Sequence, residues 1–297
     1  MICAMIGAML IGLIKAMRPR QWVKNVLIFA AVVFDRKLRN FPALIDTILG
    51  FVVFCLIASA VYLINDLTDI EADRQHPQKR HRPIASGEIP VWATWLAVVI
   101  LLGVSFPLAY WLSPLFATVC AAYFFLNLAY SLWLKHVVLV DVLVLASFYV
   151  IRVMAGVTII DVERFSPWLY LSTTFLALFM GIGKRRAELF MAQETGVNHR
   201  KVLHSYSLEY LDQLITIVLT ISILAYSLYT FSAENLPENH IMMLTIPFVI
   251  YGIFRYLYLI QVEGHGEAPE EVLFNDRPFQ VNLMFWAVSV LIIFYIF

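Results

Sequence analysis

Charged residues and cysteines are both scarce in this sequence of 297 residues. Asp, Glu, Lys and Arg together make up 14% of it, whereas 61% is hydrophobic and the mean hydropathy is +0.80. A soluble domain has about 25% charged and 45–50% apolar residues, so a water-soluble globule is excluded. The three cysteines, Cys3, Cys55 and Cys120, are far apart and have no zinc-ligand spacing. They predict neither a disulfide framework nor a zinc site, and the last two are expected to be small core residues.

An excess of either charge is also absent, because 21 basic residues balance 21 acidic ones. Overall charge therefore favours neither a nucleic acid nor an anionic surface as a partner. The sequence also lacks internal repeats, low-complexity tracts and long linkers. We expect one membrane domain over residues 18–297, after a lead-in over residues 1–17. The apolar start of this lead-in has no signal-peptide pattern, which indicates an uncleaved interfacial segment or a start codon placed too far upstream.

Long hydrophobic runs are what the sequence does have. Most are near or above the roughly 20 residues that a helix needs to cross the hydrocarbon core of a bilayer. We therefore expect an all-α, polytopic integral membrane protein. The nine predicted spans cover residues 22–34, 43–65, 91–112, 115–134, 137–160, 167–183, 211–231, 241–262 and 279–297.

The distribution of Lys and Arg predicts the orientation of these spans. With a cytoplasmic N-terminus, 15 of the 21 basic residues fall on the cytoplasmic side. The opposite side has four, of which Arg36, Lys37 and Arg39 form an exception in one loop. Because positive charge concentrates in cytoplasmic loops, we expect the N-terminus inside and the C-terminus outside the cell membrane.

The acidic residues concentrate at the end of the second span. Residues 65–88 read NDLTDIEADRQHPQKRHRPIASGE and contain nine charged residues in 24 positions. On a continuous helix, Asn65, Asp66, Asp69 and Asp73 fall within one arc of about 100°. Carboxylates gathered at a membrane boundary need a cation, and oxygen ligands of this kind suit Mg²⁺ together with substrate phosphates. The alternative is a solvated acidic end of the helix, which the helix dipole disfavours.

A basic loop follows the carboxylates directly. It could pair with them, stay solvated under the positive-inside rule, or bind phosphate. Beside a Mg²⁺ site the third interpretation is favoured. The candidate phosphate ligands in this loop are Lys79, Arg80 and Arg82.

Other predicted cytoplasmic segments add polar residues to the candidate site. Asp141 and Arg152 lie in one apolar span, about 16 Å apart at 1.5 Å per residue, so each needs a partner from another helix or a ligand. An interhelical bond is as well supported as a function for Arg152, whereas a function in substrate binding is favoured for Asp141, which lies nearer the cytoplasmic edge. The further candidates for binding substrate are Lys24, Tyr130, Lys135, Lys184, Arg185 and Glu188, although Lys184 and Glu188 also have the spacing of an ordinary helical salt bridge.

These motifs together resemble the UbiA superfamily of membrane prenyltransferases. In that superfamily the N-D-x-x-D-x-x-x-D pattern, here Asn65 to Asp73, binds diphosphate through Mg²⁺. More narrowly, a set of segments resembles the branch that transfers 5-phosphoribose from phosphoribosyl pyrophosphate (PRPP) to a polyprenyl phosphate, for cell-wall arabinan. These segments read RPRQWVKN, NDLTDIEADRQHPQKRHRPIASGEIP, AYSLWLKHVVLVD, YVIRVMAGV and GKRRAEL. The usual second aspartate-rich motif is replaced here by Lys184, Arg185, Arg186 and Glu188.

The resemblance implies a reaction and a set of ligands. Asp66, Asp69 and Asp73, with Asn65, would hold Mg²⁺ on the pyrophosphate, while the acceptor's own phosphate attacks ribose C1. Replacing carboxylates by cations at 184–186 suits substrates with additional phosphates. The other partners implied are the lipid acceptor and the bilayer, with no nucleic acid, and a homo-oligomer stays open. The alternatives are a prenyltransferase acting on a small aromatic acceptor and, in another class, a secondary transporter using Asp141 and Arg152.

Overall fold

The computed structural model describes residues 2–75, 79–160, 162, 166–195, 201–233, 236–263, 272 and 275–296. All regular structure in these ranges is helical, which agrees with the expected all-α class. The chain forms two compact units that share several segments of the sequence. Unit 1 contains residues 1–31, 40–131 and 152–161, and unit 2 contains residues 32–39, 132–151 and 162–297.

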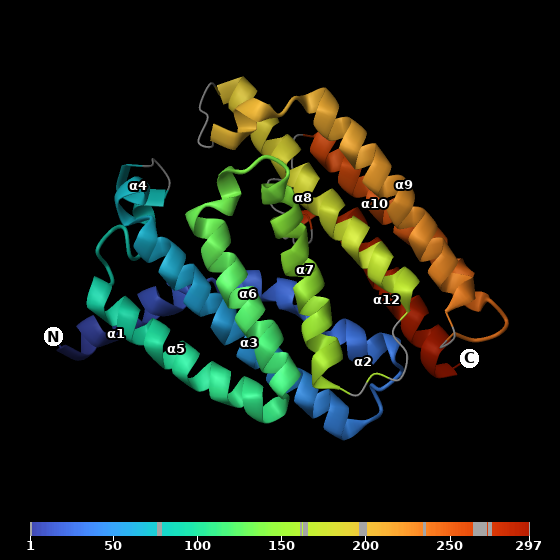
Figure 1. Ribbon diagram of the computed structural model, residues 1–297, viewed down its shortest axis with the longest axis horizontal. Helices are drawn as coiled ribbons and strands as arrows, with labels where there is room; N and C mark the ends of the chain where they lie inside the picture. Colours follow the sequence, from blue (N-terminus) through green and yellow to red (C-terminus); the bar gives the residue numbers. More distant parts are fainter. Residues whose placement is uncertain are drawn as a thin grey trace. The chain divides into compact units, whose positions relative to one another are not determined.

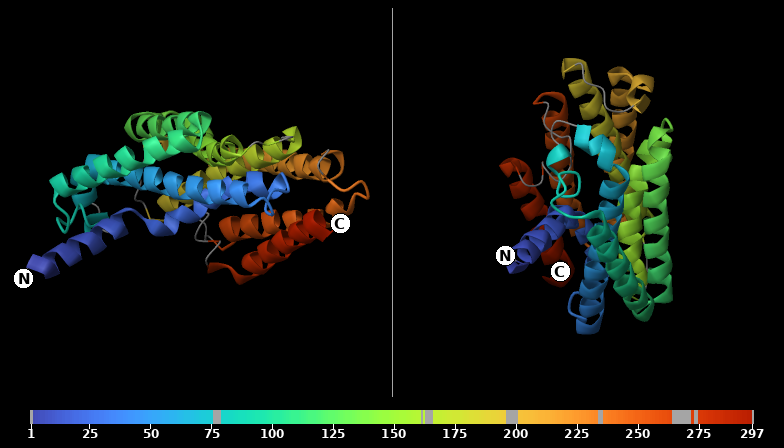
Figure 2. Two further views of the ribbon diagram at one scale, coloured as in Figure 1. Left: turned by 90° about the horizontal axis from the view of Figure 1, so that it is seen from below. Right: turned by 90° about the vertical axis from the view of Figure 1, so that its left-hand side faces the viewer.

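Unit 1 is built around one long apolar helix. The helix α3 (Phe41–Thr68) lies beside α5 (Val91–Leu112), as Figures 1 and 2 show. Its start is fixed by Asn40, whose side chain accepts a hydrogen bond from the backbone N–H of Ala43 as a helix N-cap. The other elements are α1 (Ile2–Ala16), the 3-10 helix η1 (Pro19–Phe29), α4 (Ile70–Gln75), η2 (Lys79–His81), α6 (Pro114–Leu132) and the end of α7 (Val140–Ile159).

Unit 2 contains two neighbouring pairs of helices. The first pair is α8 (Pro167–Thr195) with α9 (Leu208–Ser232), and the second is α10 (Ile246–Gln261) with α12 (Arg277–Ile296), which lie side by side in Figure 2. Buried apolar side chains of α8, α9 and α10 form one core. The remaining elements are α2 (Ala30–Phe34), η3 (Leu134–His136), the first part of α7, η4 (Lys201–Ser205) and η5 (Ile241–Thr245).

Seven helical segments are long and apolar enough to span a membrane within the described chain. They match seven of the nine predicted spans: α3, α5, α6, α7, α9, η5 with α10, and α12. The first predicted span differs, because residues 22–34 form most of η1 and the short α2 rather than one long α-helix. The sixth is helical as α8, but this helix continues through the charged residues 184–186 and does not meet the same criterion.

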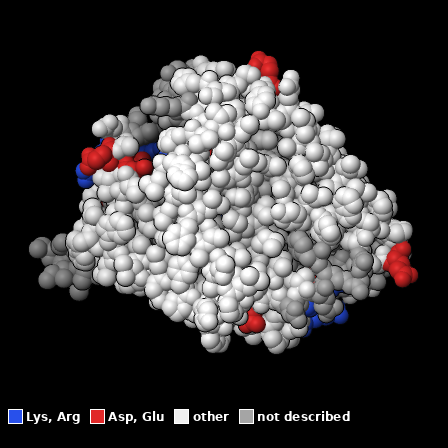
Figure 3. All heavy atoms as spheres, viewed as in Figure 1, with Lys and Arg blue, Asp and Glu red and all other residues white. Residues whose placement is uncertain are grey.

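Polar groups are largely absent from the outer surfaces of the spans in unit 1. The helices α5 and α6 contain no charged residue, and their visible faces are uncharged in Figure 3. Trp95, Val99 and Phe125 are among the large apolar side chains that they expose. Such surfaces are stable only in contact with lipid, so unit 1 is embedded in a bilayer. The buried Cys55 and Cys120 carry free thiols, as predicted.

Two polar clusters as candidate functional sites

The predicted carboxylate motif lies where α3 gives way to α4. The helix is interrupted at Asp69, so the motif is not on one uniform helix as the spacing assumed. The interruption is small, since the N–H of Asp69 bonds the carbonyl of Asn65 at 3.0 Å and the N–H of Asp73 bonds that of Asp69 at 2.8 Å. Asp66 and Asp73 are both 3% exposed and therefore lie on the inner side of this junction.

Arg82 joins the two buried carboxylates. One of its guanidinium nitrogens, Nη1, lies 3.2 Å from Oδ1 of Asp66 and 2.6 Å from Oδ2 of Asp73. The same Oδ1 of Asp66 accepts a hydrogen bond of 2.5 Å from Nη2 of Arg18. The carboxylates of Asp66 and Asp73 therefore both contact the guanidinium of Arg82. The basic loop thus pairs with the acidic motif, which was one of its three predicted roles.

The other two residues of the motif have different surroundings. The Oδ1 atom of Asn65 accepts a hydrogen bond of 2.7 Å from the hydroxyl of Ser131, at the end of α6. Asp69 is half-buried, and its side chain has no hydrogen-bonding or ionic partner among the described residues. Asp69 is thus the carboxylate of the motif that is available to a ligand.

The chemistry of this group is suited to Mg²⁺. Its carboxylate and amide oxygens are the ligands that Mg²⁺ prefers, and two of the carboxylates already share a cation. Within the ranges that the structure describes, no three His, Cys, Asp or Glu side chains lie close enough together to bind one metal ion by themselves. Mg²⁺ usually takes one or two carboxylates and completes its octahedron with water and substrate phosphates. The residues present fit such a substrate-completed site.

The remaining predicted ligands in unit 1 lie near its polar end. Lys79 and Arg80 are exposed on η2, whereas Arg82, three residues after Lys79, turns inward to the carboxylates. Lys24 on η1 and Tyr130 on α6 are half-buried and both make polar or aromatic contacts. Part of the loop between α4 and η2, including His76, lies outside the described residues.

A second polar cluster lies in unit 2 around Asp141. Its carboxylate accepts hydrogen bonds from Nε of Arg185 and from the hydroxyl of Tyr206, the latter at 2.7 Å. Arg185 also donates to Glu188 at 2.6 Å. Asp141 and Arg185 have no exposed surface, whereas the side chain of Glu188 is 21% exposed. Asp141 therefore has protein partners, and Glu188 is the member of the cluster that a ligand can reach.

Tyr206 fixes the position of this cluster. Its hydroxyl accepts a hydrogen bond of 2.7 Å from the backbone N–H of Leu139, which adopts a left-handed backbone with φ of 66°. Burial raises the pKa of the Tyr206 hydroxyl, and the adjacent Asp141 raises it further. The hydroxyl therefore stays protonated and donates to Asp141 at all physiological pH values.

The other predicted residues of unit 2 are close to Asp141 or Arg185 along the chain. Lys135 is half-buried on η3, and Lys184 is half-buried on α8, where it has polar contacts. Arg186, next along α8, is bonded to Asp212 of α9 at 2.6 Å. Of the three consecutive cations, two are thus held by acidic partners within the unit.

Arg152 has a structural position in unit 1. Its Nε donates to Oδ1 of Asn25 at 2.8 Å, its Nη2 donates to the hydroxyl of Tyr123 at 3.1 Å, and it is 4% exposed. Of the two interpretations of Arg152, the interhelical bond is the one observed. A transporter relay that uses Arg152 and Asp141 loses its support, because each has partners within its own unit.

Three residues of the clusters were not predicted from the sequence. From the sequence, Arg18 is only one of the 15 basic residues predicted to be cytoplasmic, and Ser131 and Tyr206 have no predicted role. Each is separated from its partner by 48 to 66 positions in the chain. For Arg18 the signal available was its place in the segment RPRQWVKN, which carries part of the family resemblance.

The fold and the motif are those of a family of integral membrane enzymes, and the chain belongs to the UbiA prenyltransferase family, whose model matches residues 26–275. Among its relatives is the decaprenyl-phosphate phosphoribosyltransferase of Mycobacterium tuberculosis H37Rv, which is 40% identical over 289 residues, 94% of this chain and 93% of that protein. The enzyme of the same name from Corynebacterium glutamicum is 38% identical over 299 residues, 96% of this chain and 87% of that protein.

Solved structures have the same fold. A UbiA homolog from Archaeoglobus fulgidus, bound to DMAPP and Mg²⁺, aligns with a TM-score of 0.70 and 20% identity, over 96% of this chain and 99% of that one. The same homolog bound to GPP and Mg²⁺ gives a TM-score of 0.71 over 95% of this chain and 99% of that one. At 20% identity these structural similarities establish the fold alone, and they agree with the all-helical membrane fold of this chain.

Proposed function

We propose that the chain transfers 5-phosphoribose from PRPP to decaprenyl or another polyprenyl phosphate, with release of pyrophosphate. The observation that carries this proposal is the identity of 38–40% to decaprenyl-phosphate phosphoribosyltransferases over nearly the whole chain. The carboxylate cluster at the α3–α4 junction adds a site suited to a phosphorylated donor. The product would be a precursor for cell-wall arabinan, made at the cytoplasmic face of the cell membrane.

The residues of unit 1 divide the work on the donor. Asp66, Asp69 and Asp73, supported by Asn65, would hold Mg²⁺, which neutralises the pyrophosphate leaving group when it is bound. Lys79 and Arg80 are exposed cations that bind the donor's phosphates. Arg82 positions Asp66 and Asp73 from one side, so the carboxylates are oriented before the donor arrives.

The acceptor needs no base from the protein. A lipid phosphate is already anionic at neutral pH, so its oxygen attacks ribose C1 directly while the C1–pyrophosphate bond breaks. Attack from the side opposite the leaving group inverts C1. Lys24 of unit 1 and Lys184 of unit 2 are alternative candidates for a contact with the lipid phosphate, and positioning together with charge neutralisation supplies most of the rate.

The cluster in unit 2 contributes through its accessible members. Glu188, Lys184 and Lys135 of unit 2 are proposed polar contacts of the substrates, and Tyr130 of unit 1 is proposed separately as another. Arg185 and Asp141 have no exposed surface, so we assign them to holding Glu188 and Tyr206 in place rather than to touching substrate.

A screen of donors and acceptors tests this function. The purified protein with PRPP, Mg²⁺ and decaprenyl phosphate is expected to yield a phosphoribosylated lipid, identified by mass spectrometry, while Asp69→Ala and Asp73→Ala abolish it. Asp46→Ala, on α3 at the other end of the helix, is the matched control and keeps activity. Turnover of the wild-type protein in excess chelator would contradict the role of the metal.

The same screen decides the nearest alternative. A family named for prenyl transfer includes enzymes whose structures hold GPP and Mg²⁺, so a prenyl diphosphate is the competing donor. Prenylation of a small aromatic acceptor, with no product from PRPP, would replace the proposal by this alternative.

A further inference from the structure

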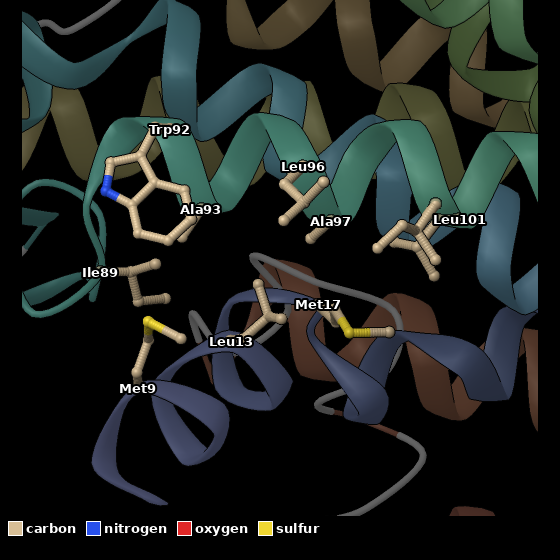
Figure 4. Close-up of a pocket in the computed structure, with 10 residues that line it drawn as sticks. Met9, Leu13, Met17, Ile89, Trp92, Ala93, Leu96, Ala97 and Leu101 are labelled. Atoms are coloured by element: carbon tan, nitrogen blue, oxygen red, sulfur yellow. The ribbon is translucent and has the colours of Figure 1, made fainter. Parts of the chain in front are cut away.

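An apolar groove lies in unit 1 between α1 and the start of α5. It has a volume of about 280 Å³ and is lined by Met9, Leu13, Met17, Ile89, Trp92, Ala93, Leu96, Ala97, Ile100 and Leu101. Figure 4 shows the side chains of α1 on one side and those of α5 on the other. None of the lining residues is charged, and the part of α5 from Trp92 to Leu101 is about 14 Å long at 1.5 Å per residue.

The two walls of the groove are in close contact near Gly12 of α1. A Cβ atom added to Gly12 would lie 3.0 Å from the carboxylate of Glu88 and 3.2 Å from the side chain of Ile89. At this position α1 therefore approaches the segment before α5 as closely as a residue without a side chain allows. On either side of Gly12, the larger residues Met9 and Leu13 face the groove.

The groove opens to a lipid environment. Across it, Trp92 is 66%, Leu96 is 52% and Ile100 is 55% exposed. On the far side of α1, Ile11 and Ile14 are 68% and 57% exposed, so both faces of this helix are apolar. A groove with these walls takes a hydrocarbon chain, because its lining is apolar apart from the indole N–H of Trp92.

The residue that follows the groove-lining part of this segment is a cation, Arg18. Met17 is the last groove residue of this segment, and its carbonyl oxygen accepts a hydrogen bond of 3.3 Å from Ser59 of α3. The next residue, Arg18, has a left-handed backbone with φ of 54°, and its guanidinium bonds Asp66 and lies over the ring of Tyr62. The strained backbone turns the chain from the groove to the carboxylate cluster within one residue.

We propose that the α1–α5 groove binds the phosphate-proximal part of the acceptor's isoprenoid chain, with Arg18 contacting its phosphate. This inference rests on the proposed function, because it assigns a place to the acceptor of that reaction. An apolar groove that ends at an arginine matches a ligand with an apolar chain and an anionic end. The groove is too short for a whole decaprenyl chain, so the distal isoprene units lie in the bilayer.

Filling the groove tests the proposal. Ala97→Trp is expected to raise the KM for decaprenyl phosphate about tenfold or more, because the indole occupies space that the chain needs. The KM for PRPP is expected to stay unchanged. Val99→Trp is the control on the same helix, since Val99 is 64% exposed and does not line the groove. Equal effects of the two variants on the KM for decaprenyl phosphate would overturn the inference.

A measurement independent of turnover separates this inference from the proposed function. The photoreactive residue p-benzoylphenylalanine is placed at position 13, facing the groove, or at position 11, on the opposite face of α1. With decaprenyl phosphate in phospholipid nanodiscs, position 13 is expected to give the decaprenyl phosphate adduct and position 11 the phospholipid adduct. Only phospholipid at position 13 would overturn the groove assignment. If position 13 gives the decaprenyl phosphate adduct while the wild-type protein has no transferase activity, the proposed function alone is refuted.

Discussion

At the scale of single residues, Arg82 determines the electrostatics of the acidic motif. The side chains of Asp66 and Asp73 are only 3% and 4% exposed, and without a cation both would be buried anions. Removing one partner from such a group costs about 3–5 kcal/mol, because the remaining charge stays desolvated. Arg82 is itself 28% exposed, so solvent reduces the cost of its own loss.

We predict that Arg82→Met lowers the midpoint of thermal unfolding, and that Mg²⁺ restores part of the loss. The metal replaces the lost cation between the two carboxylates, so it stabilises the variant more than the wild-type protein. The measurement is unfolding in detergent with and without MgCl₂. Arg80→Met, on the same loop with an exposed side chain, serves as the control and has a midpoint close to wild type. An equal Mg²⁺ response in wild type and Arg82→Met would contradict the assignment.

Residue-scale patterns in the sequence predicted part of this site. Their spacing predicts that Asp66 and Asp73 lie on one side of a helix, and both do contact one group, Arg82, despite the interruption at Asp69. The Mg²⁺ site predicted from the same spacing stays a prediction. Arg18 and Tyr206 were missed, since their partners lie 48 and 65 positions away. A spacing rule reports only neighbours along the chain, whereas these bonds depend on how helices pack.

At the scale of elements, the contact between α7 and η1 depends on one glycine. A Cβ atom at Gly156 would lie 2.0 Å from the carbonyl oxygen of Ile28 and 3.3 Å from Cβ of Ala31. Because the nearest atom belongs to the backbone, no rotamer change relieves the overlap. This close approach accompanies the bond from Arg152 of α7 to Asn25 of η1.

We therefore predict that Gly156→Ala destabilises the protein by about 1–3 kcal/mol, the usual cost of overpacking a core. The reason is that α7 must move away from η1, which also lengthens the bond between Arg152 and Asn25. Gly103→Ala on α5 is the matched control, since nothing lies within 4 Å of its added Cβ. Chemical denaturation of both variants, followed by tryptophan fluorescence, measures the difference. Two identical denaturation curves would show that the backbone accommodates the methyl group.

Element boundaries were predictable where hydrophobicity alone determines them. Seven spans follow from apolar runs long enough to cross the bilayer. The run over residues 22–34 is short and contains the polar residues Lys24 and Asn25 near its start, and here it forms a 3-10 helix followed by a single short α-helix. Its polar residue Asn25 is buried against Arg152, a tertiary contact that the hydropathy of the segment does not report.

At the scale of the whole molecule, the loop with Arg36, Lys37 and Arg39 is the exception to the predicted orientation. In the structure each of these cations has a local role. Arg36 donates hydrogen bonds to the carbonyl oxygen of Phe294, and the guanidinium of Arg39 lies over the ring of Tyr295. Nζ of Lys37 lies 2.8 Å from Oδ2 of Asp35 in an ion pair. Cations near the carbonyl end of a helix are favoured by its dipole, so packing explains their position.

We predict that the chain has its N-terminus in the cytoplasm and its C-terminus outside. In a background where Cys3 is replaced by Ser, the buried Cys55 and Cys120 give little labelling. A membrane-impermeant maleimide added to intact cells is then expected to label Glu238→Cys, while Ser86→Cys reacts only after permeabilisation. Both positions are exposed in the folded protein, so accessibility reports the side of the membrane. The reverse pattern would invert the orientation.

The bond between Arg36 and Phe294 also has a consequence for biosynthesis. It joins positions 258 residues apart, so the segment over residues 32–39 cannot reach this partner until nearly the whole chain has been translated. Contacts of such large sequence separation form late because a long loop must close first. The early spans of unit 1 can pack while the ribosome is still adding α12, whereas unit 2 must wait for it. Newly made chains that stop before Phe294 should therefore present an assembled unit 1 and an incomplete unit 2 to the quality-control proteases of the membrane.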